Sequence, residues 1–328
     1  MSTTLTEKPT TPEPEPGPRR RLLHGLPWLV VRQHRTALVC VLGLTLLCAA
    51  LIVYERHEMV QLLDAKGWPE KSAGDPLQND RGYGYITSVL GGLPLILAVF
   101  IGAPLIAGDQ ENGTAQLVTT QSVTRRQWLI AKLGLAYTLA LVSGLVLSAL
   151  FTWWWKPYRS VFLSDWIDGV IFDNTGPVLP ASLLFLTAAG VTIGVLVRRV
   201  LPAMVVTFLF TAMTTMYVWT ELRVHLGSTR MFTYPMDTEL PARFDEAYEV
   251  ERWVGSADGT LYGWGTCAEA TEKAQNACIE EHGIVNDVIE YLDYSQMATM
   301  QWTAAGLLLA ATALLTALTL WRVSRRPL

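Results

Sequence analysis

Charged residues are scarce in this sequence. Asp, Glu, Lys and Arg make up 16% of its 328 residues, whereas roughly 25% is usual for soluble domains. Six windows of 19 residues or more contain none of these four types. A helix needs about 20 apolar residues to cross a bilayer, so the windows predict six membrane-spanning helices and exclude a soluble enzyme. They lie between residues 35 and 55, 81 and 109, 132 and 156, 173 and 198, 199 and 221, and 293 and 322.

The residue patterns of several chemistries are also missing. No window contains Asp, Glu, Lys, Arg or His, which argues against proton-coupled transport. A Gly-x-x-x-x-Gly-Lys-Ser/Thr phosphate loop is absent, so no ATP binding by that route is expected. The five histidines are scattered without metal-ligand spacing. We therefore expect this chain to be no enzyme, with no catalytic residue, no metal site and no cofactor of its own.

Lys and Arg are distributed unequally over the segments that connect the windows. Successive connecting segments lie on alternate sides of the membrane. The segments on the side of the N-terminus hold 14 Lys and Arg in 68 residues, and the segments on the other side hold 11 in 118 residues. The positive-inside rule assigns the more basic set to the cytoplasm. We therefore predict a multi-pass protein of the cell (plasma) membrane with both termini cytoplasmic. Residues 221–293 then form a large acidic segment outside.

Composition divides the chain into four predicted parts. Residues 1–20, rich in Pro, Thr and Glu, are expected to be a disordered cytoplasmic tail. Residues 21–220 hold an interfacial helix and spans one to five, residues 221–300 an extracytoplasmic domain, and residues 301–328 the sixth span and a cytoplasmic tail. The interfacial helix is the apolar run 22–31, which is too short to span and acts either mechanically or only as an anchor. The predicted fold class is all-α integral membrane, with six transmembrane helices, an N-terminal interfacial helix and a large extracytoplasmic segment between spans five and six.

Two of the four cysteines, Cys267 and Cys278, lie in the predicted outside segment, where disulfides can persist. Helices are expected near 241–251 and 266–293, the second beginning at Thr266 because a capping-box pattern starts there. An unbroken helix would hold the two cysteine backbones about 16 Å apart, too far to bridge. A disulfide with a break in the helix and a pair of free thiols both remain open.

Small and hydroxyl-bearing residues form two patterns inside the windows. Gly190 and Gly194 form a Gly-x-x-x-Gly pair, which lets helix backbones pack closely within a bundle. Four threonines share one face of the fifth span, where their hydroxyls either bond their own helix carbonyls or line a substrate path. A proline in the second span predicts a kink beside that path. The candidate path residues are Thr207, Thr211, Thr214, Thr215 and Pro94.

The segment 108–132 is predicted to be a cytoplasmic coupling segment. Thr114 and Thr124 are each suited to cap a helix. Arg125 and Arg126 would lie at the inner membrane surface. A compact polar helix that projects into the cytosol suits docking of a soluble partner, but from the residues alone an ordinary polar loop fits equally well.

This segment resembles the inside loop of type-2 ABC exporter permeases and is similar to an actinobacterial subgroup of them. The resemblance is carried by Glu-x-Gly-Thr at 111–114 and by Thr-Gln-Ser-Val-x-Arg-Arg-x-Trp-Leu-x-x-Lys at 120–132. It continues in Phe172-Asp173 with Gly176-Pro177. One departure is Gly108-Asp109, where such permeases usually carry an Arg-Glu pair.

The resemblance implies the permease subunit of an ATP-binding-cassette exporter, with ATP and Mg bound by a separate ABC ATPase subunit. It also implies a second permease copy, identical or paralogous. The other expected partner is membrane lipid, and no nucleic-acid partner is expected. The alternative is a non-transport membrane sensor or assembly scaffold that uses residues 221–293. The implied ATPase-coupling residues are Glu111, Gly113, Thr114, Gln121, Arg125 and Arg126.

Overall fold

The computed structural model describes residues 26–70, 81–113, 124–162 and 164–325. Within these residues, six helical rods are long and apolar enough to cross a membrane, as the charge-free windows predict. Each rod contains or closely follows one window, and several continue past its charged boundary because a helix does not stop at the first charged residue. The rods cover Arg35–Lys66, Gly82–Glu111, Arg125–Val161, Val178–Val197, Val200–Val224 and Tyr294–Arg325.

Two of the rods contain a π-helical turn. A π-helical turn, Ala98–Gly102, connects α3 to α4 in the second span, and another, Thr214–Val218, connects α9 to α10 in the fifth. Such turns often mark functional sites. The α-helices are α1 (Leu26–Gln33), α2 (Arg35–Lys66), α3 (Arg81–Leu97), α4 (Pro104–Glu111), α6 (Arg125–Trp155), α7 (Gly169–Phe172), α8 (Val178–Val197), α9 (Val200–Met213), α10 (Trp219–Val224), α11 (Glu272–His282) and α12 (Met297–Arg325).

Helix α8 is the most buried span. Of its most apolar window 78% is buried, against 17% for Val200–Val224. A Cβ added at Gly190 would lie 2.4 Å from the Ala98 carbonyl oxygen, and one added at Gly194 would lie 2.3 Å from the Ala103 carbonyl oxygen. Only glycine permits so close an approach, so the predicted packing role of this pair is confirmed. The two glycines seat α8 directly on the π-helical turn of the second span.

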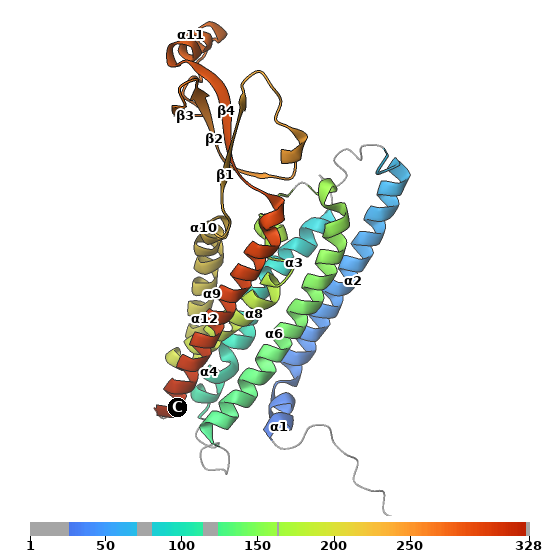
Figure 1. Cartoon of the computed structure of the whole chain (residues 1–328). Coiled ribbons are helices and arrows are strands. Elements are labelled where there is room, and N and C mark those ends of the chain that lie inside the picture. The colour runs from blue at the N-terminus through green and yellow to red at the C-terminus, as the bar shows by residue number, and fades with distance from the viewer. Residues whose placement is uncertain (1–25, 71–80, 114–123, 163, 326–328) are drawn as a thin grey trace, which may run out of the picture.

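Beyond the bundle, residues between α10 and α12 form a four-stranded antiparallel sheet in the order β1-β4-β2-β3. The sheet and α11 stand at one end of the bundle, whereas α1 and the C-terminus lie at the other (Figure 1). Strand β4 is central and pairs with both β1 and β2. The strands are β1 (Arg230–Pro235), β2 (Tyr248–Ser256), β3 (Leu261–Gly263) and β4 (Ile284–Leu292).

This sheet shows that the expectation of an all-α chain was wrong for the segment between spans five and six. Only a short 3₁₀ turn, Ala242–Phe244, and the start of β2 occupy the predicted helix 241–251. Within the predicted helix 266–293, only Glu272–His282 is helical, as α11, and strand β4 occupies Ile284–Leu292. The β-branched Val288 and Ile289 are buried in that strand, at 2% and 1% exposure. These β-branched residues and the pairing with two distant strands therefore favour a strand over the predicted helix.

A disulfide joins Cys267 and Cys278, with Cα atoms 5.6 Å apart. The predicted helix start at Thr266 is wrong, because α11 begins after Thr271, whose side chain accepts a hydrogen bond from the backbone N–H of Ala274. Turns around Thr266, with hydrogen bonds back to glycine carbonyls, occupy the preceding residues. The bridge therefore fits because Cys267 lies outside the helix that carries Cys278.

Candidate functional site

At the end of the bundle that carries α1 (the α1 end), α4 stops at Glu111 and α6 starts at Arg125 (Figure 1). Gly113 follows α4 with φ +69°, a left-handed conformation that favours glycine. Thr124 caps α6 as predicted, because its hydroxyl accepts from the Gln127 backbone N–H and the Gln127 side chain accepts from the Thr124 N–H. Two of the predicted coupling residues, Thr114 and Gln121, lie outside the described residues.

Glu111 makes a long-range contact that the sequence did not indicate. Its Oε2 accepts a hydrogen bond of 2.7 Å from the backbone N–H of Val200, the first residue of α9. The residue before α9, Arg199, provides no side-chain cap. The first N–H groups of a helix have no partner within that helix and carry partial positive charge, so a carboxylate satisfies and stabilises them. Glu111 thus ties the end of the second span to the start of the fifth.

Arg125 and Arg126 occupy the first turn of α6. Arg126 is exposed and Arg125 is half-buried. Neither forms an ion pair with another residue that the structure describes. Positive charge at a helix N-terminus is unfavourable by about 0.3–1 kcal/mol at low ionic strength. The two arginines therefore do not stabilise α6 through the helix dipole or through an ion pair with a described residue.

A buried ion pair between Asp109 and Lys132 lies beneath this surface. Lys132 is completely buried in α6 and also donates to the Leu105 carbonyl oxygen at 3.1 Å. The amide of Gln33 at the end of α1 donates to Asp109 at 3.2 Å, so three helices meet here. Lys132 bounds the third charge-free window, and α6 begins seven residues before it, so Lys132 lies within this helical rod but outside the window. A buried charge is tolerated where it is paired and hydrogen-bonded.

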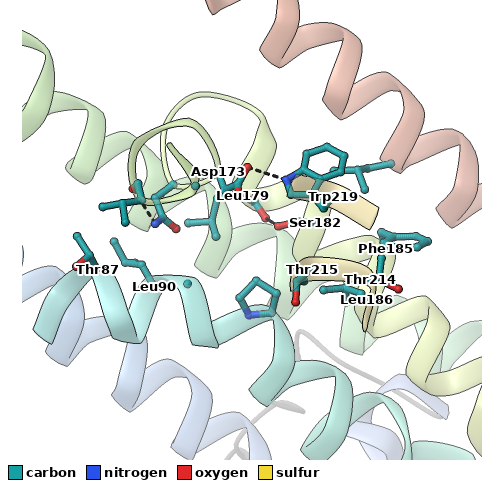
Figure 2. Close-up of a pocket in the computed structure, with 16 residues that line it drawn as sticks. Thr87, Leu90, Asp173, Leu179, Ser182, Phe185, Leu186, Thr214, Thr215 and Trp219 are labelled. Carbon is teal, nitrogen blue, oxygen red and sulfur yellow. Dashed lines mark hydrogen bonds between the residues drawn. The ribbon is translucent and has the colours of Figure 1, made fainter. Parts of the chain in front are cut away.

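Nearer the sheet end, a cavity of about 220 Å³ lies between α3, α7, α8 and the π-helical turn Thr214–Val218. Pro94, Thr214 and Thr215 line it, so three of the five predicted path residues meet at one place. Thr87 and Leu90 of α3 lie across the cavity from Thr214 and Thr215 (Figure 2). Two of the spans that line this cavity contain a π-helical turn. Ala98–Gly102 directly follows α3, which carries Pro94, and Thr214–Val218 is part of the cavity wall.

The other two predicted path residues, Thr207 and Thr211, do not reach the cavity. Both are fully buried, and their hydroxyls have no hydrogen-bond partner among the described residues. Thr215, in contrast, donates to the carbonyl of Thr211 at 2.9 Å. The predicted polar face is therefore divided, with one half packed inside the bundle and the other half open to the cavity.

Asp173 forms the polar end of the cavity. Its carboxylate accepts from the Trp219 indole N–H at 2.8 Å, shown as a dashed line in Figure 2, and from Arg223 at 3.0 Å. Burial raises the pKa of Asp173 above its ordinary value, and the opposing effects of Arg223 and Trp219 are smaller. The sequence marked Asp173 only as part of a motif, because Arg223 lies 50 residues further along. This cluster ties α10 to the loop after α7.

Comparison with known protein families identifies the chain. The family described as ABC-2 membrane transporter related matches residues 42–223, more than half of the chain. The chain belongs to the ABC-2 membrane transporter related family. The matched region runs from the first span to the end of the fifth and includes Glu111, Arg125, Arg126 and the walls of the cavity from α3 to α10. No curated protein and no solved structure matches the chain.

Proposed function

We propose that this protein is the permease subunit of an ABC exporter, driven by a separate ATPase that docks at the α1 end. Membership of the ABC-2 membrane transporter related family supports a transporter of the membrane. Two features of the α1 end support the docking site. The basic pair Arg125 and Arg126 has no partner ion among the described residues, and Glu111 connects the same surface to α9. The proposed orientation has both termini in the cytoplasm and the β-sheet outside.

The Glu111 contact carries the mechanism. When the ATPase subunits close on ATP, they push on the segment between α4 and α6. The push moves Glu111 and, through its hydrogen bond to Val200, the start of α9. Helix α9 continues through the π-helical turn Thr214–Val218, which lines the cavity. A displacement at the α1 end therefore reaches the walls of the proposed substrate path through one continuous span.

Glu111 acts in this mechanism as a connecting residue rather than a simple contact of the ATPase. Its carboxylate is already engaged by the α9 N-terminus. Arg125 and Arg126 are the residues that would meet acidic groups of the ATPase. Gly113 provides the turn that leads from α4 into the docking segment, and Thr114 and Gln121 are proposed contacts within it.

A second permease copy would cover the exposed face of the fifth span. This span is the least buried of the six, and large apolar side chains cover its surface. Leu201, Met216 and Tyr217 are 73%, 68% and 63% exposed. An apolar helix face in a membrane is covered either by lipid or by protein. We propose that two copies, identical or paralogous, pack along this face with the substrate path between them.

The test is the ATP turnover of the complex between this chain and an ABC ATPase that co-purifies with it, reconstituted in lipid nanodiscs. Charge reversal by Arg125→Glu should lower permease-dependent turnover at least about fivefold. The matched control is Glu280→Lys, a charge reversal on exposed α11 at the opposite end, which should leave turnover unchanged. If turnover were indifferent to Arg125→Glu, or fell equally in both variants, the docking proposal would fail.

A further inference from the structure

We propose that the cavity between α3, α8 and the π-helical turn Thr214–Val218 binds an uncharged apolar group that carries a hydroxyl. The inference rests on the proposed function, because it takes the cavity as part of the substrate path and names the chemical class of substrate that this path accepts. The volume of the cavity limits the size of this group. An apolar cavity of about 150 Å³ holds benzene, so the cavity of about 220 Å³ holds roughly nine non-hydrogen atoms. That volume suits one ring, or one end of a larger molecule.

The walls exclude a charged ligand. Leu90, Leu179, Phe185 and Leu186 supply apolar surface. Asp173 is the one charged residue among the described lining residues. Its two carboxylate oxygens already accept from the Trp219 indole and the Arg223 guanidinium. A cation would have to compete with Arg223, and an anion would meet the carboxylate. An uncharged group avoids both penalties.

Three hydroxyls of the polar lining favour a ligand that donates a hydrogen bond. Thr87 donates its hydroxyl proton to the Tyr83 carbonyl at 2.9 Å, Ser182 to the Leu179 carbonyl at 2.9 Å, and Thr215 to the Thr211 carbonyl at 2.9 Å. A hydroxyl has one proton and two lone pairs. With these protons directed to their own helices, the three oxygens offer the cavity only acceptor positions. An alcohol can donate to them, whereas an ether of the same shape cannot.

Two neighbouring glycines of α3 provide a matched pair of variants. A Cβ built at Gly91 or at Gly92 meets no atom within 4 Å, so neither backbone position excludes a side chain. Gly91 lines the cavity and Gly92 does not. Gly91→Leu therefore places four carbon atoms in or against the cavity, and Gly92→Leu adds the same four carbons to the same helix elsewhere. Both changes remove one glycine from α3 and alter its helix propensity equally.

The experiment is a ¹⁹F NMR titration of the full-length chain in lipid nanodiscs with 4-fluorobenzyl alcohol, an uncharged ring compound of about nine non-hydrogen atoms, the size expected for this cavity. Empty nanodiscs report partition into lipid. The proposal predicts a saturable, protein-dependent signal for the wild type and for Gly92→Leu, and at least about a tenfold loss of affinity for Gly91→Leu. The methyl ether of the same compound should bind about fivefold more weakly, because one hydrogen bond is lost.

A second variant addresses the hydroxyl directly. Thr215→Val keeps the shape of the side chain and removes its oxygen, so it should reduce the preference for the alcohol over the ether while leaving binding of the ether unchanged. Non-saturable binding, or binding that survives Gly91→Leu undiminished, would overturn the cavity assignment. Equal affinity for alcohol and ether in the wild type would overturn the donor requirement. Binding is measured without the ATPase, so a failure of ATPase docking would contradict the proposed function and leave this result standing.

Discussion

The hydrogen bond from Val200 to Glu111 can be separated from the charge of Glu111 by two substitutions. Glu111→Ala removes the acceptor from the first N–H of α9, whereas Glu111→Gln keeps an acceptor oxygen and removes the charge. Loss of a helix-capping side chain costs about 0.5–2 kcal/mol. Since Glu111 is exposed, we take a value of about 1 kcal/mol. This corresponds to roughly a fivefold change in the equilibrium between the state in which Glu111 bonds the α9 N-terminus and the state in which it does not.

The assay is permease-dependent ATP turnover of the nanodisc complex, measured together with its thermal unfolding. We expect Glu111→Ala to lower the stimulated turnover about fivefold and Glu111→Gln to lower it less than about twofold. Glu221→Ala is the control, because Glu221 is an exposed glutamate in α10, at the end of the fifth span opposite to Val200. An equal loss for Glu111→Gln and Glu111→Ala would refute the capping mechanism and make charge the relevant property. Full activity of Glu111→Ala would refute the connection altogether.

Three further substitutions test the packing that supports this site. Lys132→Met should destabilise the bundle by about 3–5 kcal/mol, because it leaves Asp109 buried without its ion pair; pairing it with Asp109→Asn should restore much of the loss in a thermal unfolding measurement. Gly190→Ala should lower the unfolding temperature, since the new Cβ would lie 2.4 Å from a carbonyl oxygen of the second span, whereas Gly306→Ala, with nothing within 4 Å, should not. Cys267→Ser should destabilise the sheet domain by about 3 kcal/mol, the value expected for a short closed loop, and proteolysis of this domain with and without reductant should show the same difference. If the reduced and oxidised chains were digested at the same rate, the disulfide would have no stabilising role.

The membrane part of the fold could be predicted from the sequence because hydrocarbon imposes a simple rule. An uncharged segment that is long enough to cross the bilayer must form all of its backbone hydrogen bonds internally, and a helix does so. The six spans and the Gly190 packing site follow from that rule and from residue size. The two π-helical turns do not follow from it, since they add one residue to a helical turn without a clear change in residue type.

The pairing of the strands and the polar contacts could not be predicted, because they depend on residues far apart in the chain. Strand β4 itself had a local signal that the predicted helix 266–293 overlooked, since Ile284, Val288 and Ile289 are β-branched residues that favour a strand. The partners Glu111 and Val200 are separated by 89 residues, and Gln33 and Asp109 by 76. For the polar contacts, one signal was available. Asp109 and Lys132 each bound a charge-free window, so both lie where a helix enters the bundle, and opposite charges at such positions can pair.

The central claim, that a separate ATPase docks at the α1 end, is tested most directly by site-specific cross-linking. A chain in which Cys40 and Cys48 are replaced by serine would carry Arg126→Cys at the proposed docking surface or Glu280→Cys on α11 at the sheet end. A short thiol-to-lysine cross-linker would then be added to the complex with the co-purified ATPase. We predict that Arg126→Cys forms a cross-link to the ATPase and that Glu280→Cys forms none. Cross-linking at Glu280→Cys, or none at Arg126→Cys in a complex that co-purifies, would contradict the account.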